Sequence, residues 1–557
     1  MIFFMDPADL DIYHYARQTP TYKVRALYMI GILSWLGVLW GYLQMYSANR
    51  LFFFVVAPIV GFLVCYHLLS YTISLYYRQF DSKNHKRRVK RFEPNMLTRD
   101  GSTPLIDIFL PICGEPTDVL RHTFAAVSKL DYPHLAVYVL DDKGVEDHRA
   151  LAAEYHFTYL SREHKGHMKK AGNLKFGFDH SKGDFFAIFD ADFAPHPRFL
   201  TELLPYMRNK KVGIVQSPQY FQVDDEVHAR SPLEYGAAHV QEDFYRYIQV
   251  ARSNLGAPTC CGSNALYRRA ALDSIGGTVQ IEHSEDAYTG FALLTKGWKV
   301  VYVPLILAVG LCPADLHTYF HQQHRWASGS FSLMFDRSFW RSKLTVAQKL
   351  CFISGFMYYF GHPVAILFSF QIFALLFFFH ATMHLSSVLP FIPSILFAFV
   401  LVPNFRLTRG RFGGFLARHT SLYSYAHAAA VSLLGRSLSW QPAGARRSSI
   451  SRAYHQKLAI VAGFFFVYAS LVVFSLAAGT LDLRNMNEYS LLFWILYDLL
   501  TSAFVLYHSF MVIDRATCAQ MRQGSPHTHL LWRLRTAGTY CALLLVTCIS
   551  LVHVYGR

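Results

Sequence analysis

Two short acidic motifs each follow an apolar run of strand length. They are Asp141-Asp142 after residues 137–140 and Asp190-Ala191-Asp192 after residues 185–189. Parallel strands end at one edge of their sheet, and ligands bind at that edge, so the two motifs are expected to face a common site. Carboxylates there can hold Mg²⁺ or Mn²⁺, because hard cations take carboxylate oxygens together with substrate phosphates. Aspartate is also a common turn residue after strands, so only the presence of both motifs favours a divalent-cation site.

Two more motifs lie further along the chain. They are Glu282-His283-Ser284-Glu285-Asp286, just before an expected helix at 287–296, and Gln322-Gln323-His324-Arg325-Trp326. Each has an ordinary structural interpretation. Acidic residues stabilise the first turn of a helix through its dipole, and Trp and Arg are common at the headgroup level of a membrane. Neither motif identifies a function by itself.

Short apolar runs alternate with helical patterns between residues 104 and 326. Runs of strand length occupy residues 106–110, 137–140, 185–189 and 212–215, and helical patterns include residues 119–130 and 148–155. Strands that alternate with helices predict an α/β domain with a parallel sheet. Such a sheet would carry the first two acidic motifs on one rim.

The composition excludes both an ordinary soluble protein and a disordered one. Of 557 residues, 53% are hydrophobic and 16% are charged, against about 25% charged in a soluble domain. The 53 Lys and Arg exceed the 37 Asp and Glu, which gives a net charge of +16. This excess indicates the inner face of a membrane and no nucleic-acid partner, because the basic residues lie beside apolar segments. The nine cysteines are scattered, without a disulfide framework or zinc-type spacing.

Seven apolar segments approach or exceed the roughly 20 residues that a membrane-spanning helix needs. They are residues 26–45, 52–73, 364–379, 388–402, 460–478, 491–513 and 539–555. The fourth is short and contains Pro390 and Pro393. The pattern predicts a multi-pass protein with an N-terminal transmembrane pair at 1–77, a cytosolic domain at 78–345, and a transmembrane and interface-helix region at 346–557.

Basic residues orient the predicted spans. A basic cluster at residues 83–91 follows the second span, and the loops at 404–457 and 514–535 are also basic, whereas the short loops on the other side carry only Arg50 and Arg484. Basic loops are retained on the cytoplasmic side. The N-terminus and the middle domain are therefore expected in the cytoplasm, and the protein in the plasma (inner) membrane, with the lipid bilayer as a partner.

Taken in order, the four motifs resemble those of the processive family 2 glycosyltransferases, which include the cellulose, hyaluronan and chitin synthases. The family pattern is D, DxD, (T/S)ED and QxxRW, and here it is Asp141-Asp142, Asp190-Ala191-Asp192, Ser284-Glu285-Asp286 and Gln322-x-x-Arg325-Trp326. Bacterial cellulose synthases are the most similar branch, through Pro111-Ile-Cys-Gly-Glu115-Pro116, Lys170-Ala171-Gly172-Asn173 and Cys261-Gly262-Ser263. The resemblance implies an α/β GT-A glycosyltransferase domain, with a Rossmann-like parallel sheet, inserted in a polytopic α-helical membrane domain.

The same resemblance implies a role for each motif residue. Sugar would pass from a UDP-sugar donor to a hydroxyl of a growing polysaccharide, with Asp286 as general base and Glu285 and Ser284 beside it. Donor-binding residues would be Pro111, Glu115, Asp141, Asp142, Lys170, Asp190, Gln322 and Arg325, and Asp190 and Asp192 would hold Mg²⁺ or Mn²⁺. Acceptor-binding residues would be Cys261, Gly262, Ser263 and Trp326.

Two residues and one loop depart from the cellulose synthase pattern. Phe193 follows Asp192 where that branch commonly has His, and Cys260 precedes the Cys-Gly-Ser turn where Phe is common. These two departures leave open which glycosidic linkage is formed and which acceptor is used. The segment 438–447 corresponds to a gating loop but lacks its Val-Thr-x-Lys core, so a basic juxtamembrane loop is an equal interpretation.

The leading hypothesis is an inverting, processive hexosyltransferase. It would polymerise glucose from UDP-glucose into a β-glucan (cellulose, mixed-linkage or β-1,3-linked) and move the polymer across the membrane, with accessory export subunits or as a homo-oligomer among the open possibilities. Alternatives keep the fold but use UDP-GlcNAc, alone or with UDP-glucuronate, or transfer sugar to a lipid acceptor. A transporter with a regulatory domain is disfavoured, because ionisable residues within spans mark transport paths and Asp498 is the exception in otherwise uncharged span centres.

Overall fold

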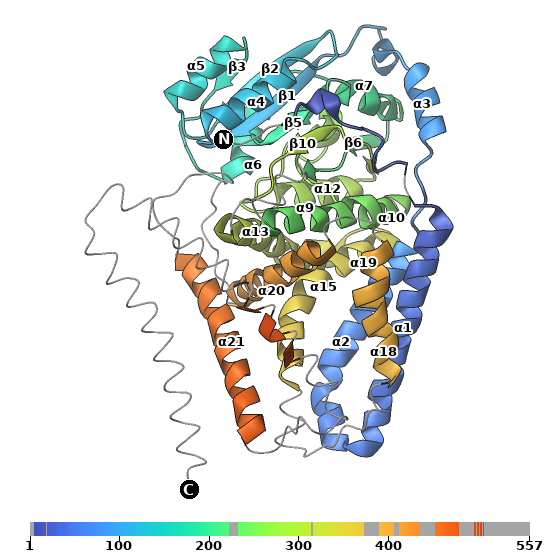
Figure 1. Cartoon of the computed structure of the whole chain (residues 1–557). Helices are drawn as coiled ribbons and strands as arrows, with labels where there is room; N and C mark the ends of the chain where they lie inside the picture. Colours follow the sequence, from blue (N-terminus) through green and yellow to red (C-terminus); the bar gives the residue numbers. More distant parts are fainter. Residues whose placement is uncertain are drawn as a thin grey trace, which may run out of the picture.

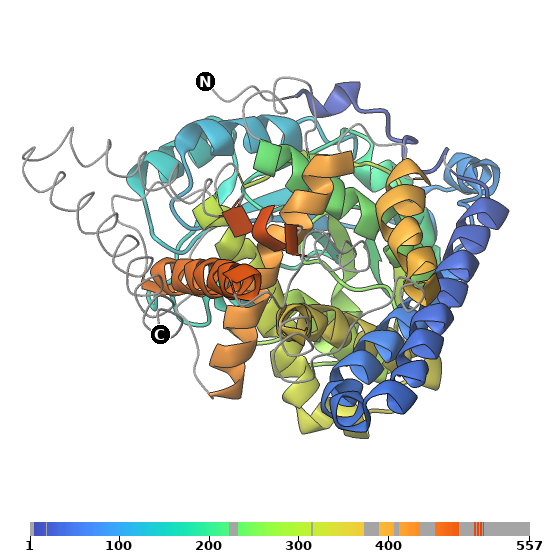
Figure 2. The same ribbon diagram turned by 60° about the horizontal axis from the view of Figure 1, so that its bottom comes forward.

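The structure, a computed structural model, describes residues 5–17, 19–221, 232–313, 316–371, 389–405, 411–434, 452–477 and several positions between 495 and 505. A sheet domain lies above a set of long helices, and α9 (Pro232–Asp243), α10 (Gln249–Asn254) and α13 (Leu316–Phe335) form a layer between the two (Figure 1). Figure 2 shows α21 (Arg452–Ala477) on the opposite side of the molecule from α1 (Thr21–Ala48) and α2 (Arg50–Ser74), with α15 (Val346–Ser369) between them.

The sheet domain is built on seven strands, which follow the order β3-β2-β1-β4-β8-β6-β9 across the sheet. Their bounds are β1 Ile106–Ile112, β2 Leu135–Asp141, β3 Thr158–Leu160, β4 Phe185–Ile188, β6 Val212–Gln216, β8 Ala265–Arg268 and β9 Lys299–Tyr302. The four strands predicted from apolar runs are β1, β2, β4 and β6, and each agrees within two residues at either end. Both acidic motifs therefore do follow strands of one sheet.

One strand runs against the others. β8 pairs antiparallel with both β4 and β6, whereas β1 with β2 and β4, β2 with β3, and β6 with β9 pair in parallel. The expectation of a wholly parallel sheet is therefore wrong at β8. The reversal matters for the site, because the turn that leads into β8, Cys261-Gly262-Ser263, lies at the same rim where β4 and β6 end.

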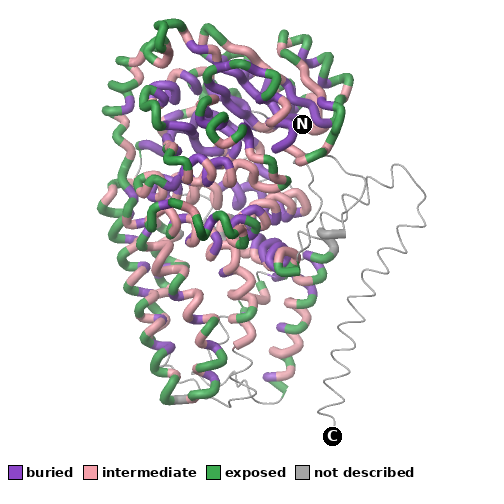
Figure 3. The backbone as a smooth tube through the Cα atoms, turned by 180° about the vertical axis from the view of Figure 1, so that it is seen from behind, coloured by how far each residue is buried: buried purple, intermediate pink, exposed green. Residues whose placement is uncertain are grey.

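Apolar side chains fill both faces of the sheet. On β1, Ile106, Ile108 and Leu110 belong to one core and Phe109 to the other, which is the pattern of a strand covered on both faces. The covering helices include α4 Thr117–Val127, α5 Glu146–Glu154, α6 Lys169–Asp179, α7 Phe199–Leu203, α11 Arg269–Asp273 and α12 Glu285–Thr295. Figure 3 shows that buried residues concentrate in this domain, while the long helices are mostly half-buried or exposed.

A second, three-stranded sheet continues from the rim. Its strands are β5 Phe193–Pro195, β7 Tyr220–Phe221 and β10 Ala308–Gly310, in the order β5-β10-β7. β5 begins directly after Asp192, so β4 and β5 hold the Asp-x-Asp turn from its two ends.

Helices lie between the sheet domain and the long apolar helices. They are α9 Pro232–Asp243, α10 Gln249–Asn254, α13 Leu316–Phe335 and α20 Arg411–Leu433. The Tyr319 hydroxyl donates to the Ala417 carbonyl at 2.9 Å, and the Ser424 hydroxyl donates to the Phe320 carbonyl at 2.7 Å. These buried bonds fix α20 against α13, which carries the Gln322–Trp326 motif.

Four helices of the described part of the chain are long and apolar enough to cross a membrane: Thr21–Ser47, Arg50–Ser74, Val346–Ser369 and Gln456–Ala477. They lie in α1 Thr21–Ala48, α2 Arg50–Ser74, α15 Val346–Ser369 and α21 Arg452–Ala477, and a shorter apolar helix covers Leu389–Leu401. The helix behind the predicted span 364–379 begins much earlier, because Thr345 and Gln348 form a capping box at its start. The predicted spans 491–513 and 539–555 and the segment 438–447 lie wholly or mostly outside the described residues, so a total of seven spans stays a prediction.

The segment before α1 packs against the sheet domain. Within the predicted N-terminal region 1–77, Ile12 and Ala16 are buried in the same core as β1, and the Ile306 backbone N–H donates to the Ile12 carbonyl at 2.9 Å. Tyr15 is buried and packs edge-on against Tyr220. Residues 5–17 therefore belong structurally to the sheet domain.

Candidate active site

A single cavity of about 740 Å³ connects the rim of the sheet with the long helices. Its wall includes the predicted residues Pro111, Glu115, Asp142, Lys170, Asp190, Asp192, Cys261, Ser284, Glu285, Asp286, Gln322, Arg325 and Trp326. It also includes side chains of α2 and α15, among them Tyr66, Tyr71 and Tyr358. The structure thus brings almost all of the predicted residues to one cavity, and Asp141, Gly262 and Ser263 follow or precede residues of its wall in the sequence.

Asp141 is fully buried and is held by four donors. Its carboxylate accepts from the backbone N–H groups of Lys143 (2.8 Å) and Val145 (2.9 Å) and from the Tyr159 hydroxyl (2.8 Å), and the His148 Nδ1 lies 3.2 Å away. Burial alone would raise its pKa, but the bonds from His148 and the backbone prevail and lower the pKa of Asp141 to about 2. Asp141 therefore stays ionised and holds the turn after β2 in place.

Asp142 and Glu115 reach the cavity from the same edge. The Arg162 Nε donates to Asp142 at 2.6 Å, and the other guanidinium nitrogens of Arg162 donate to the carbonyls of His167 and Lys169. Arg162 thereby ties Asp142 to the start of α6. Burial raises the pKa of Glu115, although the Cys113 backbone N–H, 2.5 Å from the carboxylate, opposes the shift.

Several carboxylates at and near the Asp-x-Asp turn surround Lys170. Lys170 donates to Asp190 and lies 3.8 Å from Glu285, and these carboxylates, together with Asp286, raise the pKa of the ammonium despite its burial. Among the described residues, no basic side chain forms an ion pair with Asp192 as Lys170 does with Asp190. Burial and the charges of Asp190 and Glu115 raise the pKa of Asp192 to about 7, which marks a place where one more positive charge would be accommodated.

The Ser284-Glu285-Asp286 turn is positioned by two glycines of other elements. Ser284 adopts a left-handed conformation with φ 56°. A Cβ added to Gly329 on α13 would lie 1.8 Å from the Ser284 hydroxyl oxygen, and one added to Gly262 would lie 2.8 Å from the Asp286 Cβ. Gly262 also has φ 72°, which L side chains rarely adopt. Burial and the neighbouring Glu285 raise the pKa of Asp286, and Lys170 partly offsets them.

The turn before β8 faces the cavity at Cys261. The carbonyl of Thr259 accepts from Gln216 and Gln249, and the carbonyl of Cys261 accepts from the Gln219 side chain at 3.2 Å. Ser263 is fully buried, and its hydroxyl accepts the Asp190 backbone N–H at 2.9 Å. Ser263 therefore supports the Asp-x-Asp turn, and its predicted contact with an acceptor stays a prediction.

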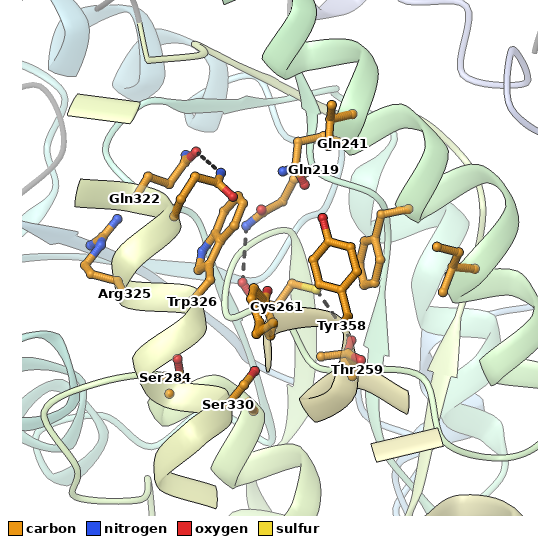
Figure 4. Close-up of a pocket in the computed structure, with 18 of the residues that line it drawn as sticks. Gln219, Gln241, Thr259, Cys261, Ser284, Gln322, Arg325, Trp326, Ser330 and Tyr358 are labelled. Carbon is orange, nitrogen blue, oxygen red and sulfur yellow. Dashed lines mark hydrogen bonds between the residues drawn. The ribbon is translucent and has the colours of Figure 1, made fainter. Parts of the chain in front are cut away.

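The motif on α13 completes the wall. Figure 4 shows Gln322 and Arg325 on one side of the Trp326 ring, with Cys261, Gln219 and Tyr358 on the other. The Arg325 Nε is buried without a hydrogen-bond partner among the described residues, and both Arg325 and Trp326 line the cavity. An indole ring and a guanidinium group in a cavity wall fit a sugar ring and a phosphate, respectively.

The two residues that depart from the cellulose synthase pattern, Phe193 and Cys260, pack against elements that surround the site. Phe193 lines the cavity and contacts Phe221 edge-on, and a Cβ on Gly310 would collide with its ring. Cys260 also borders the cavity, and a Cβ on Gly290 of α12 would lie 2.8 Å from the Cys260 Cβ. Bulkier residues at position 260 would therefore press on the helix that carries Asp286.

Several supporting residues were missed in the sequence. Gln216, Gln219 and Gln249 hold the 259–261 turn from positions that are distant in the chain, and isolated glutamines have no recognisable spacing. Gly329 does have a signal, since it lies one helical turn after Arg325, where a residue shares the face of the motif. Its closeness to Ser284 depends on how α13 crosses α12 and is invisible before the fold is known.

The mostly parallel sheet, its acidic rim and the apolar helices beneath it agree with the GT-A domain and membrane helices that the motifs predict. Residues 62–407, more than half of the chain, match the family model described as "Glycosyl transferase family 21". The chain belongs to glycosyl transferase family 21. This match and the relatives described next confirm the resemblance to cellulose synthase-like family 2 glycosyltransferases that the four motifs indicate.

The relatives include a UDP-forming cellulose synthase catalytic subunit of Xanthomonas axonopodis pv. citri, 31% identical over 261 residues, which are 46% of this chain and 36% of that protein. The UDP-forming cellulose synthase 1 catalytic subunit of Komagataeibacter xylinus is 31% identical over 279 residues, 49% of this chain and 37% of that protein. The match thus spans little more than a third of these relatives. Among solved structures, a mannosyltransferase from Pyrobaculum calidifontis aligns with a TM-score of 0.48 and 16% identity, over 68% of this chain and 99% of that one.

Proposed function

We propose that this protein is a membrane-embedded, inverting glycosyltransferase that adds glucose from UDP-glucose to a β-glucan and passes the product toward the membrane. The observation that carries the proposal is the single cavity, which continues from the carboxylates of the rim to tyrosines of α2 and α15. A donor at the rim and a chain along the tyrosines would occupy the two ends of one space. The names of the cellulose synthase relatives, which are described as UDP-forming, support the choice of nucleotide.

The donor would lie with its nucleotide toward Asp142 and Glu115 and its diphosphate between Lys170, Gln322 and Arg325. Lys170 and Arg325, which both line the cavity, would bring positive charge to the departing diphosphate, and the guanidinium group of Arg325 is suited to phosphate oxygens. The Asp141 cluster would keep the uridine side of this pocket rigid.

Asp190 and Asp192 would hold a divalent cation. No group of three His, Cys, Asp or Glu side chains within the described residues is placed to bind a metal unaided. Two carboxylates fit the usual protein share of a Mg²⁺ site that substrate phosphates complete, and the crowding of charge at Asp192 fits it as well. Such a cation, when bound, stabilises charge on the leaving diphosphate.

Asp286 would take the proton of the attacking hydroxyl. Its carboxylate lines the cavity, its pKa is raised, and its position is set by Gly262. A single displacement by a hydroxyl that Asp286 deprotonates would invert the anomeric carbon. Trp326 would stack on the acceptor sugar, and Cys261 and Gln219 would border it on the opposite side.

Release of nucleoside diphosphate by the purified protein in nanodiscs tests the proposal. The protein would be offered UDP-glucose, UDP-GlcNAc, UDP-glucuronate and GDP-mannose separately, and the product would be digested with linkage-specific glucanases. We expect UDP release with UDP-glucose and a high-molecular-weight glucan. Turnover with UDP-GlcNAc alone would contradict the choice of sugar, and no turnover with any donor would contradict the proposed reaction.

Metal removal tests the cation site. We expect EDTA to abolish UDP release and added Mn²⁺ or Mg²⁺ to restore it, because the diphosphate would leave unneutralised without a cation. Asp192→Asn should shift the restoring concentration upward while the melting temperature is retained. Full activity in EDTA would overturn the assignment of Asp190 and Asp192.

A further inference from the structure

A short chain of hydrogen bonds leads from α20 to the donor pocket. The Tyr425 hydroxyl donates to the Gln323 Oε1 at 2.5 Å, and the Gln323 Nε2 donates to the Gln322 Oε1 at 3.3 Å. Tyr425 and Gln323 are each about 2% exposed. Figure 4 shows the second of these bonds at the edge of the cavity, beside Trp326 and Arg325.

The direction of these bonds determines what Gln322 offers to a ligand. A primary amide has one acceptor oxygen and one NH₂ group. Because Gln323 donates to the Gln322 oxygen, the Gln322 NH₂ is left for the cavity, on the side where Arg325 lies. A donor group is what a diphosphate requires, and an amide turned the other way would present an oxygen to the phosphates.

We propose that Tyr425 and Gln323 are positioning residues that hold Gln322 as a hydrogen-bond donor to the sugar nucleotide, an inference that rests on the proposed function. Tyr425 fixes the Gln323 oxygen, which leaves the Gln323 NH₂ to fix the Gln322 oxygen. Each member of this hydrogen-bonded relay, which consists of Tyr425, Gln323 and Gln322, is buried or half-buried, where a misdirected amide would leave polar groups unpaired.

The relay also reaches the proposed path of the acceptor. The Tyr425 ring packs edge-on against Tyr358, Tyr359 and His362 of α15, with ring centroids 6.0, 5.0 and 4.9 Å apart. Tyr358 and Tyr359 line the cavity. Tyr425 of α20 thereby contacts the wall of the proposed acceptor path with its ring, and its hydroxyl is linked to the donor pocket through Gln323.

Tyr425→Phe is the test variant, and Tyr319→Phe is its matched control. Both remove one buried hydroxyl that bonds between α13 and α20, but the Tyr319 bond ends on the Ala417 backbone and has no link to the cavity. The variants would be compared in nanodiscs by donor KM, kcat, UDP affinity and melting temperature. For Tyr425→Phe we expect donor KM to rise and UDP affinity to fall by roughly three- to tenfold, the range of one lost buried hydrogen bond. Tyr319→Phe should leave both unchanged at a similar melting temperature.

A double-variant cycle shows whether Tyr425 acts through Gln322. In a Gln322→Ala background the Tyr425→Phe effect on donor KM and UDP affinity should vanish, because the positioned amide is already absent. Gln323→Met, which keeps the size but removes both bonds, should match Tyr425→Phe. An undiminished Tyr425→Phe effect in the Gln322→Ala background, or equal effects of Tyr425→Phe and Tyr319→Phe, would overturn the relay.

Binding of UDP separates this inference from the proposed function. If the wild-type protein binds UDP but turns over no donor, a selective loss of UDP affinity in Tyr425→Phe would support the relay while the proposed reaction fails. If the wild-type protein turns over UDP-glucose and Tyr425→Phe behaves like wild type, the relay alone fails. Absence of UDP binding by the wild-type protein would overturn both.

Discussion

Two carboxylates near the same rim, the buried Asp141 and the half-buried Asp286, differ strongly in their surroundings. Asp141 has four donors from its own turn and neighbours, and its pKa is lowered to about 2. Asp286 accepts a hydrogen bond from the adjacent Ala287 backbone N–H at 2.7 Å, and the pKa of Asp286 is raised by burial and by Glu285. One carboxylate is satisfied by the fold, and the other is left with capacity for a substrate.

The difference separates structural from chemical roles within a single set of motifs. A carboxylate with a full set of internal donors contributes to stability, since each charge-assisted bond is worth about 1.5–3 kcal/mol. A carboxylate that lacks donors costs stability and is maintained for function. Asp141→Asn should therefore mainly lower stability, whereas Asp286→Asn should mainly lower the rate of UDP release.

Asp286→Asn should lower UDP release by about two to four orders of magnitude, the usual contribution of a general base. Asparagine cannot accept the hydroxyl proton, but it is nearly isosteric and removes a buried charge. UDP affinity should therefore be kept and the melting temperature should be equal or higher. Asp273→Asn, an exposed position on α11, is the control. Near wild-type turnover by Asp286→Asn would exclude it as the base.

Asp141→Asn should instead act on folding. The amide NH₂ must replace one acceptor oxygen and then faces N–H or O–H donors of Lys143, Val145 or Tyr159. We expect a loss of about 2 kcal/mol or more in the free energy of unfolding, seen as a lower melting temperature in detergent. Unchanged stability with lost UDP binding would mean that Asp141 contacts the donor directly and does not serve mainly to stabilise the fold.

Sequence patterns identified the parts of the fold whose signal is local. Apolar runs located β1, β2, β4 and β6 within two residues, and the acids that follow the runs of β2 and β4 line or support one cavity. β8 was not predicted as a strand, because four residues carry too little of an apolar pattern to indicate one. The three residues of β5 and the two of β7 were missed for the same reason.

The supports of the site depend on long-range packing. Gln216 meets the 259–261 turn across more than forty residues, and Ile12 enters the core of β1 across about ninety. Neither contact has a period or a spacing that a sequence displays. Motif residues were predictable because their chemistry is specific, whereas the residues that position them are ordinary amides, glycines and apolar side chains.

Gly329→Ala tests how closely α13 is fitted to the base. The added methyl would overlap the Ser284 hydroxyl, and overpacking of this kind costs about 1–3 kcal/mol. The turn that carries Asp286 should shift, and kcat should fall by roughly tenfold with a smaller change in donor KM. Gly463→Ala, whose Cβ would meet nothing within 4 Å, should be neutral or slightly stabilising. Ser284→Gly in the Gly329→Ala background should restore activity, because it removes the overlapping atom at a left-handed position.

The smallest expected effect is on the pH dependence of kcat/KM, which reports the raised pKa of Asp286. Asp286 accepts a proton only when ionised, so kcat/KM should fall as the pH drops through its raised pKa. The acid limb, measured at saturating Mn²⁺, should therefore lie well above the pH near 4 at which an ordinary aspartate titrates. Glu285→Gln removes a negative charge that raises this pKa, so it should move the limb toward lower pH. A limb that stays in place in Glu285→Gln, or one near pH 4 in the wild type, would show that Asp286 is not the group whose ionisation governs the rate.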